Sequence, residues 1–116
     1  MKTKFYGNMC QVECNSDIDL YVEEIKTEGF SIIEGVLTEK ELNIYREKID
    51  EVYRKQEDDF GLDKLNSIHD KNICRMPLKY DDYFINIVTN KIVIQIVQRF
   101  LGKFYTLNLQ NAIINK

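Results

Sequence analysis

Residues 29–42 read Gly29-Phe30-Ser31-Ile32-Ile33-Glu34-Gly35-Val36-Leu37-Thr38-Glu39-Lys40-Glu41-Leu42, and this stretch sets the order of the elements on both sides of it. Gly29 predicts the end of a preceding helix, because glycine adopts the left-handed conformation there without steric cost. Residues 30–33 are mostly aromatic or β-branched and predict a short buried strand. Thr38, followed three residues later by Glu41, predicts a capping box. The stretch therefore predicts a helix end, a strand, a turn and a new helix.

Apolar residues at helical spacing predict the two helices that flank this stretch. A first helix is expected over residues 17–28, with Asn15 or Ser16 as its N-cap. A long amphipathic helix is expected to follow Thr38 and to end near Asp58. The charged residues of this helix, Lys48 among them, are expected to face solvent. Its apolar stripe consists of Leu42, Tyr45, Ile49, Val52 and Tyr53.

The region after the long helix predicts shorter elements. Residues 59–80 contain the only proline and several turn-forming residues, so they are expected to be irregular. Asp81 or Asp82 is expected to cap a short helix that ends near Asn90. Residues 91–101 are expected to form a strongly apolar helix that stops at Gly102. Because the apolar surface of this helix is wide, we expect it to lie between two layers.

Alternating residues predict a strand over residues 104–115. The face that contains Leu107, Leu109 and Ile113 is the more apolar one, so it is expected to point towards the core. Asn111 and Asn115 share that face, and buried amides there need either a ligand or a neighbouring strand as hydrogen-bond partner. Both interpretations stay open. A strand without neighbours at the end of the sequence also predicts a fragment of a longer protein, or an edge that pairs with another chain.

Composition limits the classes of function. The chain has 116 residues, 44% of them hydrophobic and 30% charged, which fits one globular domain. Residues 1–15 lack periodicity and are expected to form an irregular lead-in, which leaves residues 16–116 as the domain. The net charge of −3 argues against binding to nucleic acid or to an anionic membrane. No segment resembles a signal peptide or a membrane span, so a cytoplasmic protein is expected.

The three cysteines predict thiols in a reducing compartment. Their number is odd, and Cys10, Cys14 and Cys74 show no disulfide framework. A zinc site built from these cysteines and His69 lacks the tight ligand spacing of a structural finger. Buried thiols are therefore the favoured interpretation. His69, the only histidine, is expected to be a loop or capping residue. Arg75 and Lys79 flank Pro77 and could reach an acidic ligand, but a surface role is the favoured interpretation.

Two motifs carry a resemblance to a known family. The first is the run Glu23-Glu24-Ile25-Lys26-Thr27-Glu28-Gly29-Phe30-Ser31-Ile32-Ile33-Glu34-Gly35-Val36-Leu37-Thr38-Glu39-Lys40-Glu41-Leu42. It resembles the opening of phytanoyl-CoA dioxygenase-like proteins, where a helix, a Gly-Phe pair, a Val-Leu pair and a helix starting with Ser/Thr-x-x-Glu recur. The second is the helix over residues 91–101 with Gly102, followed by a strand that ends in Ile113-Ile114-Asn115-Lys116. It is similar to the passage of that family into its catalytic barrel.

This resemblance, which covers residues 17–116, implies the N-terminal part of an Fe(II)/2-oxoglutarate-dependent dioxygenase. The implied fold is α+β, with N-terminal helices and the first strands of a double-stranded β-helix, a jelly-roll or cupin-like barrel that is incomplete in this chain. Such enzymes convert 2-oxoglutarate to succinate while they hydroxylate an unactivated C–H bond, here of a small-molecule or lipid-like substrate. The resemblance also implies that Asn111, Asn115 and Lys116 contact 2-oxoglutarate, whose carboxylates suit amide and ammonium donors.

The sequence departs from the family in its metal ligands. The family holds Fe(II) with a His-x-Asp…His triad, and this chain contains no such set. Its one histidine, His69, lacks an aspartate two residues later. The resemblance therefore implies a longer parent enzyme that supplies the triad. The alternative is a truncated, non-catalytic module that pairs with a partner, or with a second copy, through its exposed strand.

Overall fold

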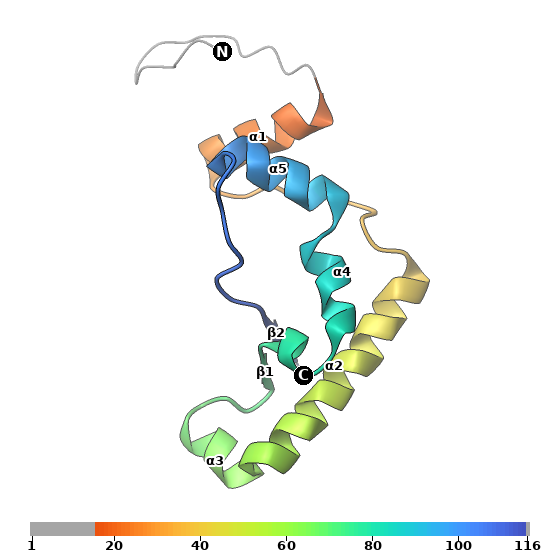
Figure 1. Ribbon diagram of the computed structural model, residues 1–116, viewed down its shortest axis with the longest axis vertical. Coiled ribbons are helices and arrows are strands. Elements are labelled where there is room, and N and C mark those ends of the chain that lie inside the picture. Colours follow the sequence, from red (N-terminus) through yellow and green to blue (C-terminus); the bar gives the residue numbers. More distant parts are fainter. Residues whose placement is uncertain (1–15, 116) are drawn as a thin grey trace.

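The computed structural model describes residues 16–115 (Figure 1), so the lead-in expected over residues 1–15 lies outside the described residues. The described part combines helices with a two-stranded antiparallel sheet, which is an α+β arrangement. None of its helices is long and apolar enough to cross a membrane. In chain order its elements are α1 (Asp17–Glu28), α2 (Glu39–Phe60), α3 (Leu62–Ser67), β1 (Ile73–Arg75), the 3-10 helices η1 (Pro77–Lys79) and η2 (Asp82–Phe84), α4 (Ile85–Val88), α5 (Lys91–Leu101) and β2 (Asn111–Ile113).

The ends of the first two helices confirm the predicted caps. The side chain of Ser16 accepts a hydrogen bond from the Asp19 amide at 3.3 Å at the start of α1, and Gly29 ends this helix with φ of 88°. At the start of α2 the Thr38 hydroxyl accepts from the Glu41 amide, while the Glu41 carboxylate accepts from the Thr38 amide at 2.8 Å. Each cap satisfies backbone donors that have no partner within the helix.

The strand predicted over residues 30–33 is wrong. These residues form no strand, and the side chains of Phe30 and Ile32 are 62% and 71% exposed. A strand requires a neighbour to satisfy its backbone groups, and no described segment pairs with this one. The turn at Glu34-Gly35 is present, with Gly35 at φ of 69°.

The helices α1 and α5 pack side by side at one end of the molecule (Figure 1). Val22 of α1 and Ile96 of α5 are both buried. The bounds predicted for α5 are confirmed, but its expected position between two layers is wrong. Phe100 and Leu101 are 44% and 60% exposed, because α1 covers only one side of the helix within the described part of the chain.

The main apolar core lies where α2 meets β1 and η2. It consists of Tyr45, Val52, Cys74 and Phe84, and the ring centroids of Tyr45 and Phe84 are 5.9 Å apart. This confirms the predicted inward stripe of α2. Cys74 is fully buried, as expected of a structural thiol, and donates a hydrogen bond to the carbonyl of Ile49. Burial raises the pKa of the Cys74 thiol to about 11. The other two cysteines lie outside the described residues.

An ion pair joins α2 to the segment that precedes α4, and it corrects one expectation. Lys48 was expected to face solvent, but its ammonium pairs with the carboxylate of Asp81 and lies 4.9 Å from the ring centroid of Tyr83. Asp81 also accepts a hydrogen bond from the Tyr83 amide at 2.8 Å, which confirms its capping role. The Lys48 side chain holds the pKa of the Asp81 carboxyl below its usual value. The predicted short helix is divided into η2 and α4.

The sheet is smaller than the sequence predicted, and β2 is turned the other way. β1 lies within the region expected to be irregular and pairs with β2 in a register that places Cys74 opposite Ala112. The strand expected over residues 104–115 is therefore limited to Asn111–Ile113, because β1 offers only three residues. Ala112 packs on the core, whereas Ile113 is 69% exposed. The face with the larger side chains points outward, opposite to the prediction.

Candidate functional site

The residues expected to contact 2-oxoglutarate lie on or next to β2. Asn111 is the first residue of this strand, and Asn115 lies two residues after its last residue, Ile113. Both side chains are exposed, which corrects the expectation that they point inward. Lys116 lies outside the described residues. Asn111 thus lies on the small sheet with its side chain exposed, and Asn115 is exposed just beyond the end of β2.

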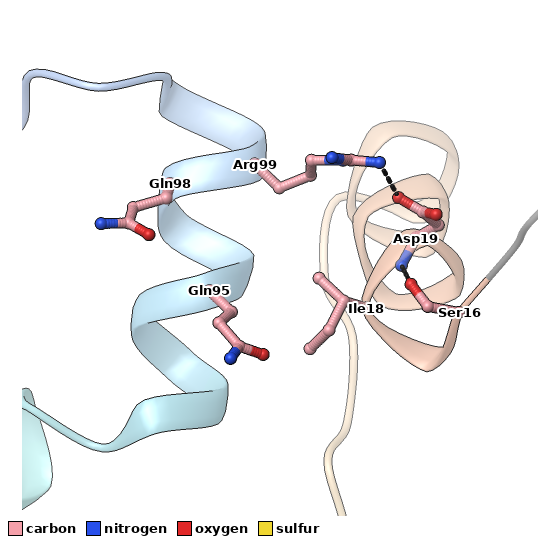
Figure 2. Close-up of a pocket in the computed structure, with 6 residues that line it drawn as sticks. All are labelled: Ser16, Ile18, Asp19, Gln95, Gln98 and Arg99. Atoms are coloured by element: carbon pink, nitrogen blue, oxygen red, sulfur yellow. Dashed lines mark hydrogen bonds and ion pairs between the residues drawn. The ribbon is translucent and has the colours of Figure 1, made fainter.

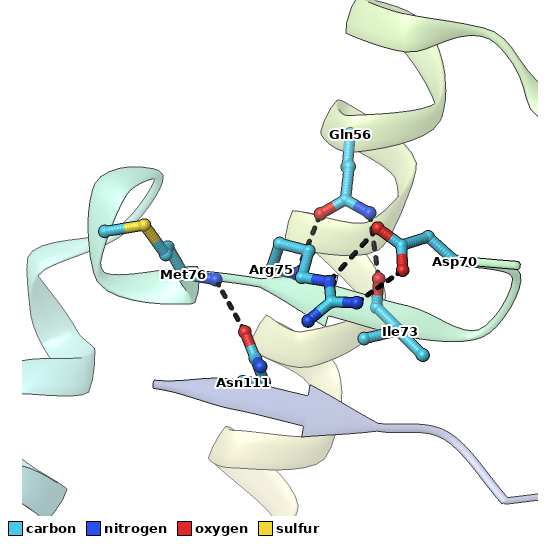
Figure 3. Close-up of polar contacts among 6 residues, drawn as sticks. All are labelled: Gln56, Asp70, Ile73, Arg75, Met76 and Asn111. Atoms are coloured by element: carbon cyan, nitrogen blue, oxygen red, sulfur yellow. Dashed lines mark hydrogen bonds and ion pairs between the residues drawn. The ribbon is translucent and has the colours of Figure 1, made fainter. Parts of the chain in front are cut away.

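The amide of Asn111 lies beside the start of η1 and across from Arg75. Its two orientations differ by an exchange of oxygen and nitrogen. In the orientation drawn in Figure 3, Oδ1 accepts from the Met76 amide at 3.4 Å. In the opposite orientation the nitrogen donates to the Gln110 carbonyl at 2.9 Å and the oxygen accepts from Arg75 Nη1 at 3.2 Å. We prefer the second orientation, because it gives each polar atom of the amide a suitable partner.

Arg75 projects from β1 and forms a bidentate ion pair with Asp70 (Figure 3). Arg75 Nε and Nη2 donate to the two carboxylate oxygens of Asp70 at 3.1 and 2.6 Å. The Arg75 side chain is 50% exposed, whereas that of Asp70 is 12% exposed. The hydrogen bonds from Arg75 hold the pKa of the Asp70 carboxyl below its usual value. The pair fixes the turn before β1 and keeps the guanidinium beside Asn111.

Replacing Asp70 by asparagine is expected to lower the melting temperature at pH 7, because Arg75 then loses its charged partner. The folded-state pKa of Asp70 is lowered, so its stabilisation is present above the unfolded pKa and is lost as the pH falls through the folded value. The two melting temperatures should therefore converge below about pH 4. Thermal unfolding across this pH range measures the effect. Asp63→Asn on α3 is the control, and equal behaviour of both variants would contradict the role of the pair.

Gln56 closes the outer edge of β1 with its side chain. This residue of α2 is 2% exposed. Its Nε2 donates to the Ile73 carbonyl at 2.8 Å and its Oε1 accepts from the Arg75 amide at 2.9 Å (Figure 3). The side-chain amide thus occupies the position that the backbone of a neighbouring strand would take. β1 is therefore paired on both edges, with β2 on one side and Gln56 on the other.

Sequence reasoning missed Gln56 and Gln110, the two amides that hold the sheet in place. Gln110 Oε1 accepts from the Leu78 amide at 3.1 Å, and its nitrogen lies 3.4 Å from the Phe84 carbonyl. One signal was available for Gln56, which follows Val52 by four residues and so falls on the apolar stripe of α2. A polar residue on such a stripe indicates a buried hydrogen-bonding role.

A surface groove with a volume of about 410 Å³ lies between α1 and α5 (Figure 2). An ion pair between Arg99 and Asp19, 2.7 Å long, crosses it. The lining charges therefore neutralise each other. A second, smaller hollow of about 190 Å³ lies beside Arg75 and is walled by Phe60, Ile68 and Met76.

The described residues do not fit an iron site. Among residues 16–115, no three histidine, cysteine, aspartate or glutamate side chains cluster closely enough to hold a metal ion. His69 lies in an exposed turn with φ of 60°, as expected for a loop residue. Cys10 and Cys14, which the zinc alternative required, lie outside the described residues. Iron ligands would have to come from residues other than those described.

Comparison with known proteins identifies two similar sequences. The chain is 28% identical over 104 residues to the "Uncharacterized protein Rv1501" of Mycobacterium tuberculosis and, at the same identity and length, to the "Uncharacterized protein Mb1539" of Mycobacterium bovis. The matched region covers 90% of this chain but only 38% of each relative. The chain thus spans less than half the length of the curated relatives it matches. No family model and no solved structure matches the chain.

Proposed function

We propose that this chain is the N-terminal part of an Fe(II)/2-oxoglutarate-dependent dioxygenase of the phytanoyl-CoA dioxygenase-like kind. The sequence resemblance over residues 17–116 motivates the proposal. The observation that supports it best is the open face of the sheet. Asn111 of β2 and Asn115 just beyond its end are both exposed, with the guanidinium of Arg75 next to Asn111. Amide and cationic donors on an accessible surface suit the carboxylates of 2-oxoglutarate.

In this proposal β1 and β2 are the first strands of a jelly-roll barrel, and the helices support it from one side. Leu107, Leu109 and Ile113 are between 56% and 69% exposed, an apolar surface that further strands would cover. The relatives are much longer than the matched region, which leaves room for such strands. The parent enzyme would also have to provide all three iron ligands, because the described residues do not.

The roles of this chain are then binding and support. Asn111, Asn115 and Lys116 would orient the 2-oxoglutarate carboxylates, while the Asp70–Arg75 pair and Gln56 hold β1 and β2 in register. When bound, iron together with 2-oxoglutarate as the electron-donating co-substrate would supply the activation of dioxygen that hydroxylates a small-molecule or lipid-like substrate. The substrate contacts would come from outside this chain.

Two measurements test the proposal. The coding sequence beyond residue 116 is expected to contain a His-x-Asp motif within roughly 10 to 30 residues, followed later by a second histidine. A longer protein with these residues should release succinate from 2-oxoglutarate, and Asn115→Ala should raise the KM for 2-oxoglutarate. An immediate stop codon would overturn the proposal. Titration of Fe(II) into the 116-residue chain should show no specific binding, and a tight stoichiometric site would contradict the assignment of iron ligands to the missing part.

A further inference from the structure

Within the described residues, the backbone groups on the outer edge of β2 have no hydrogen-bond partner, whereas those on the outer edge of β1 bind the side chain of Gln56. The Met76 amide donates to the Gln110 carbonyl at 2.9 Å, and the Ile114 amide donates to the Asn72 carbonyl at 2.8 Å. Gln110, Ala112 and Ile114 therefore direct their backbone N–H and C=O groups towards β1. In an antiparallel ladder the alternate residues point the other way. Asn111 and Ile113 thus direct their backbone N–H and C=O groups away from the sheet.

This open edge lacks the charged residues and prolines that usually prevent an edge strand from pairing with another chain. Residues 104–115 contain no charged residue, no proline and no glycine. Natural edge strands are protected by charges, prolines or bulges, because an unprotected edge accepts another strand. Exposed apolar side chains also lie in and beside the strand: Ile113 of β2 is 69% exposed, and Leu109, two residues before β2, is 58% exposed. The edge therefore has both the backbone groups and the side chains of a pairing surface.

We propose that two copies of this chain pair through β2, in an antiparallel arrangement that joins the two small sheets into one. A second copy fits this edge because an isologous interface brings each side chain near its own equivalent or a close neighbour, and like charges would repel there. The uncharged edge avoids that cost. With Ala112 on the two-fold axis, Asn111 of each copy pairs with Ile113 of the other, so both outward residues of β2 are satisfied.

The other edge of the sheet limits the assembly to a dimer. Gln56, buried in α2, already occupies the backbone groups of Ile73 and Arg75. A third chain therefore finds no free edge on β1, and the two β2 strands satisfy each other. A contact of this kind closes after two copies, whereas a sheet with two open edges grows into a filament. The inference concerns the 116-residue chain by itself, because in a longer parent enzyme a further barrel strand beside β2 would take the place of the second copy. It is tested without iron or 2-oxoglutarate, so the dimer and the proposed oxygenase function can fail separately.

Sedimentation of the 116-residue chain between about 1 and 500 µM tests the proposal, because association follows mass action. The mass is expected to rise from 13.8 kDa to twice that value and no further. Hydrogen exchange should protect the Asn111 and Ile113 amides only at high concentration, while the Ala112 amide, which faces β1, stays protected throughout. A monomer over the whole range, or growth beyond the dimer, would overturn the proposal.

Matched variants distinguish pairing through the β2 edge from non-specific hydrophobic association. Ile113→Pro removes an outward N–H without breaking the ladder to β1 and is expected to abolish the dimer. Ile113→Lys is expected to weaken the dimer at least tenfold, because it brings like charges to the edge. Phe104→Lys makes the same change in charge at a side chain that is 91% exposed and outside β2, and should leave the dimer intact. Circular dichroism confirms folding, and equal effects of the two lysine variants would refute the interface.

Discussion

Replacing Phe84 by alanine is expected to lower the free energy of unfolding by about 3–5 kcal/mol, the usual cost of removing a buried phenylalanine from a core. Phe84 is 4% exposed and belongs to the main core with Tyr45, Val52 and Cys74. Its ring packs against that of Tyr45 in α2, and Phe84 is the last residue of η2. The cavity would therefore open between α2 and η2. Urea unfolding followed by circular dichroism measures the loss.

Phe104→Ala is the matched control for this variant. The same side chain is removed, but Phe104 is 91% exposed, so the change in stability should stay within about 0.5 kcal/mol. The contrast tests whether the core around Phe84 holds the chain together. Similar midpoints for the two variants would show that it does not. A chain this small has a total stability of about 5–15 kcal/mol, so Phe84→Ala removes a large part of it.

Local signals predicted the helices well, because the capping residues that begin and end a helix lie within or next to the helix itself. Ser16 and Thr38 start α1 and α2 through side-chain caps, and Gly29 and Gly102 end α1 and α5. These signals act over three or four residues and depend little on the rest of the chain. Asp81 likewise caps the turn that the sequence assigned to it.

The sheet could not be predicted in the same way, because it depends on contacts between distant residues. The pairing of Cys74 with Ala112 joins segments that are far apart in the sequence. The hydrophobic pattern favoured burial of Leu109 and Ile113, but the short β1 strand and the hydrogen bonds of Gln110 place the opposite face inside. Strand preferences follow this tertiary context more than they follow the residues themselves. The same holds for residues 30–33, which have strand-forming side chains but no partner.

The candidate site was predicted in part. The placing of Asn111 and Asn115 on one face of the last strand stays a prediction, because β2 ends at Ile113, before Asn115. Their direction was wrong, because both are exposed, whereas Gln110 and Ala112 at alternate positions contact the rest of the protein. The pairing of Arg75 with Asp70, five residues earlier, follows from a turn whose shape no short motif announces. His69 and Asn72 in this turn have positive φ values, which only the folded context imposes.

Replacing Gln56 by methionine is expected to cost about 2–4 kcal/mol of stability although it preserves the length and much of the volume of the side chain. The variant leaves the Ile73 carbonyl and the Arg75 amide without partners, and each buried unsatisfied group costs about 1–3 kcal/mol. Gln95→Met on the exposed surface of α5 is the control and should change stability by less than about 0.5 kcal/mol. Urea unfolding compares the two. Freed of Gln56, the outer edge of β1 should also accept a strand, so this variant is expected to form species larger than a dimer. Unchanged stability and unchanged mass would show that Gln56 does not close this edge.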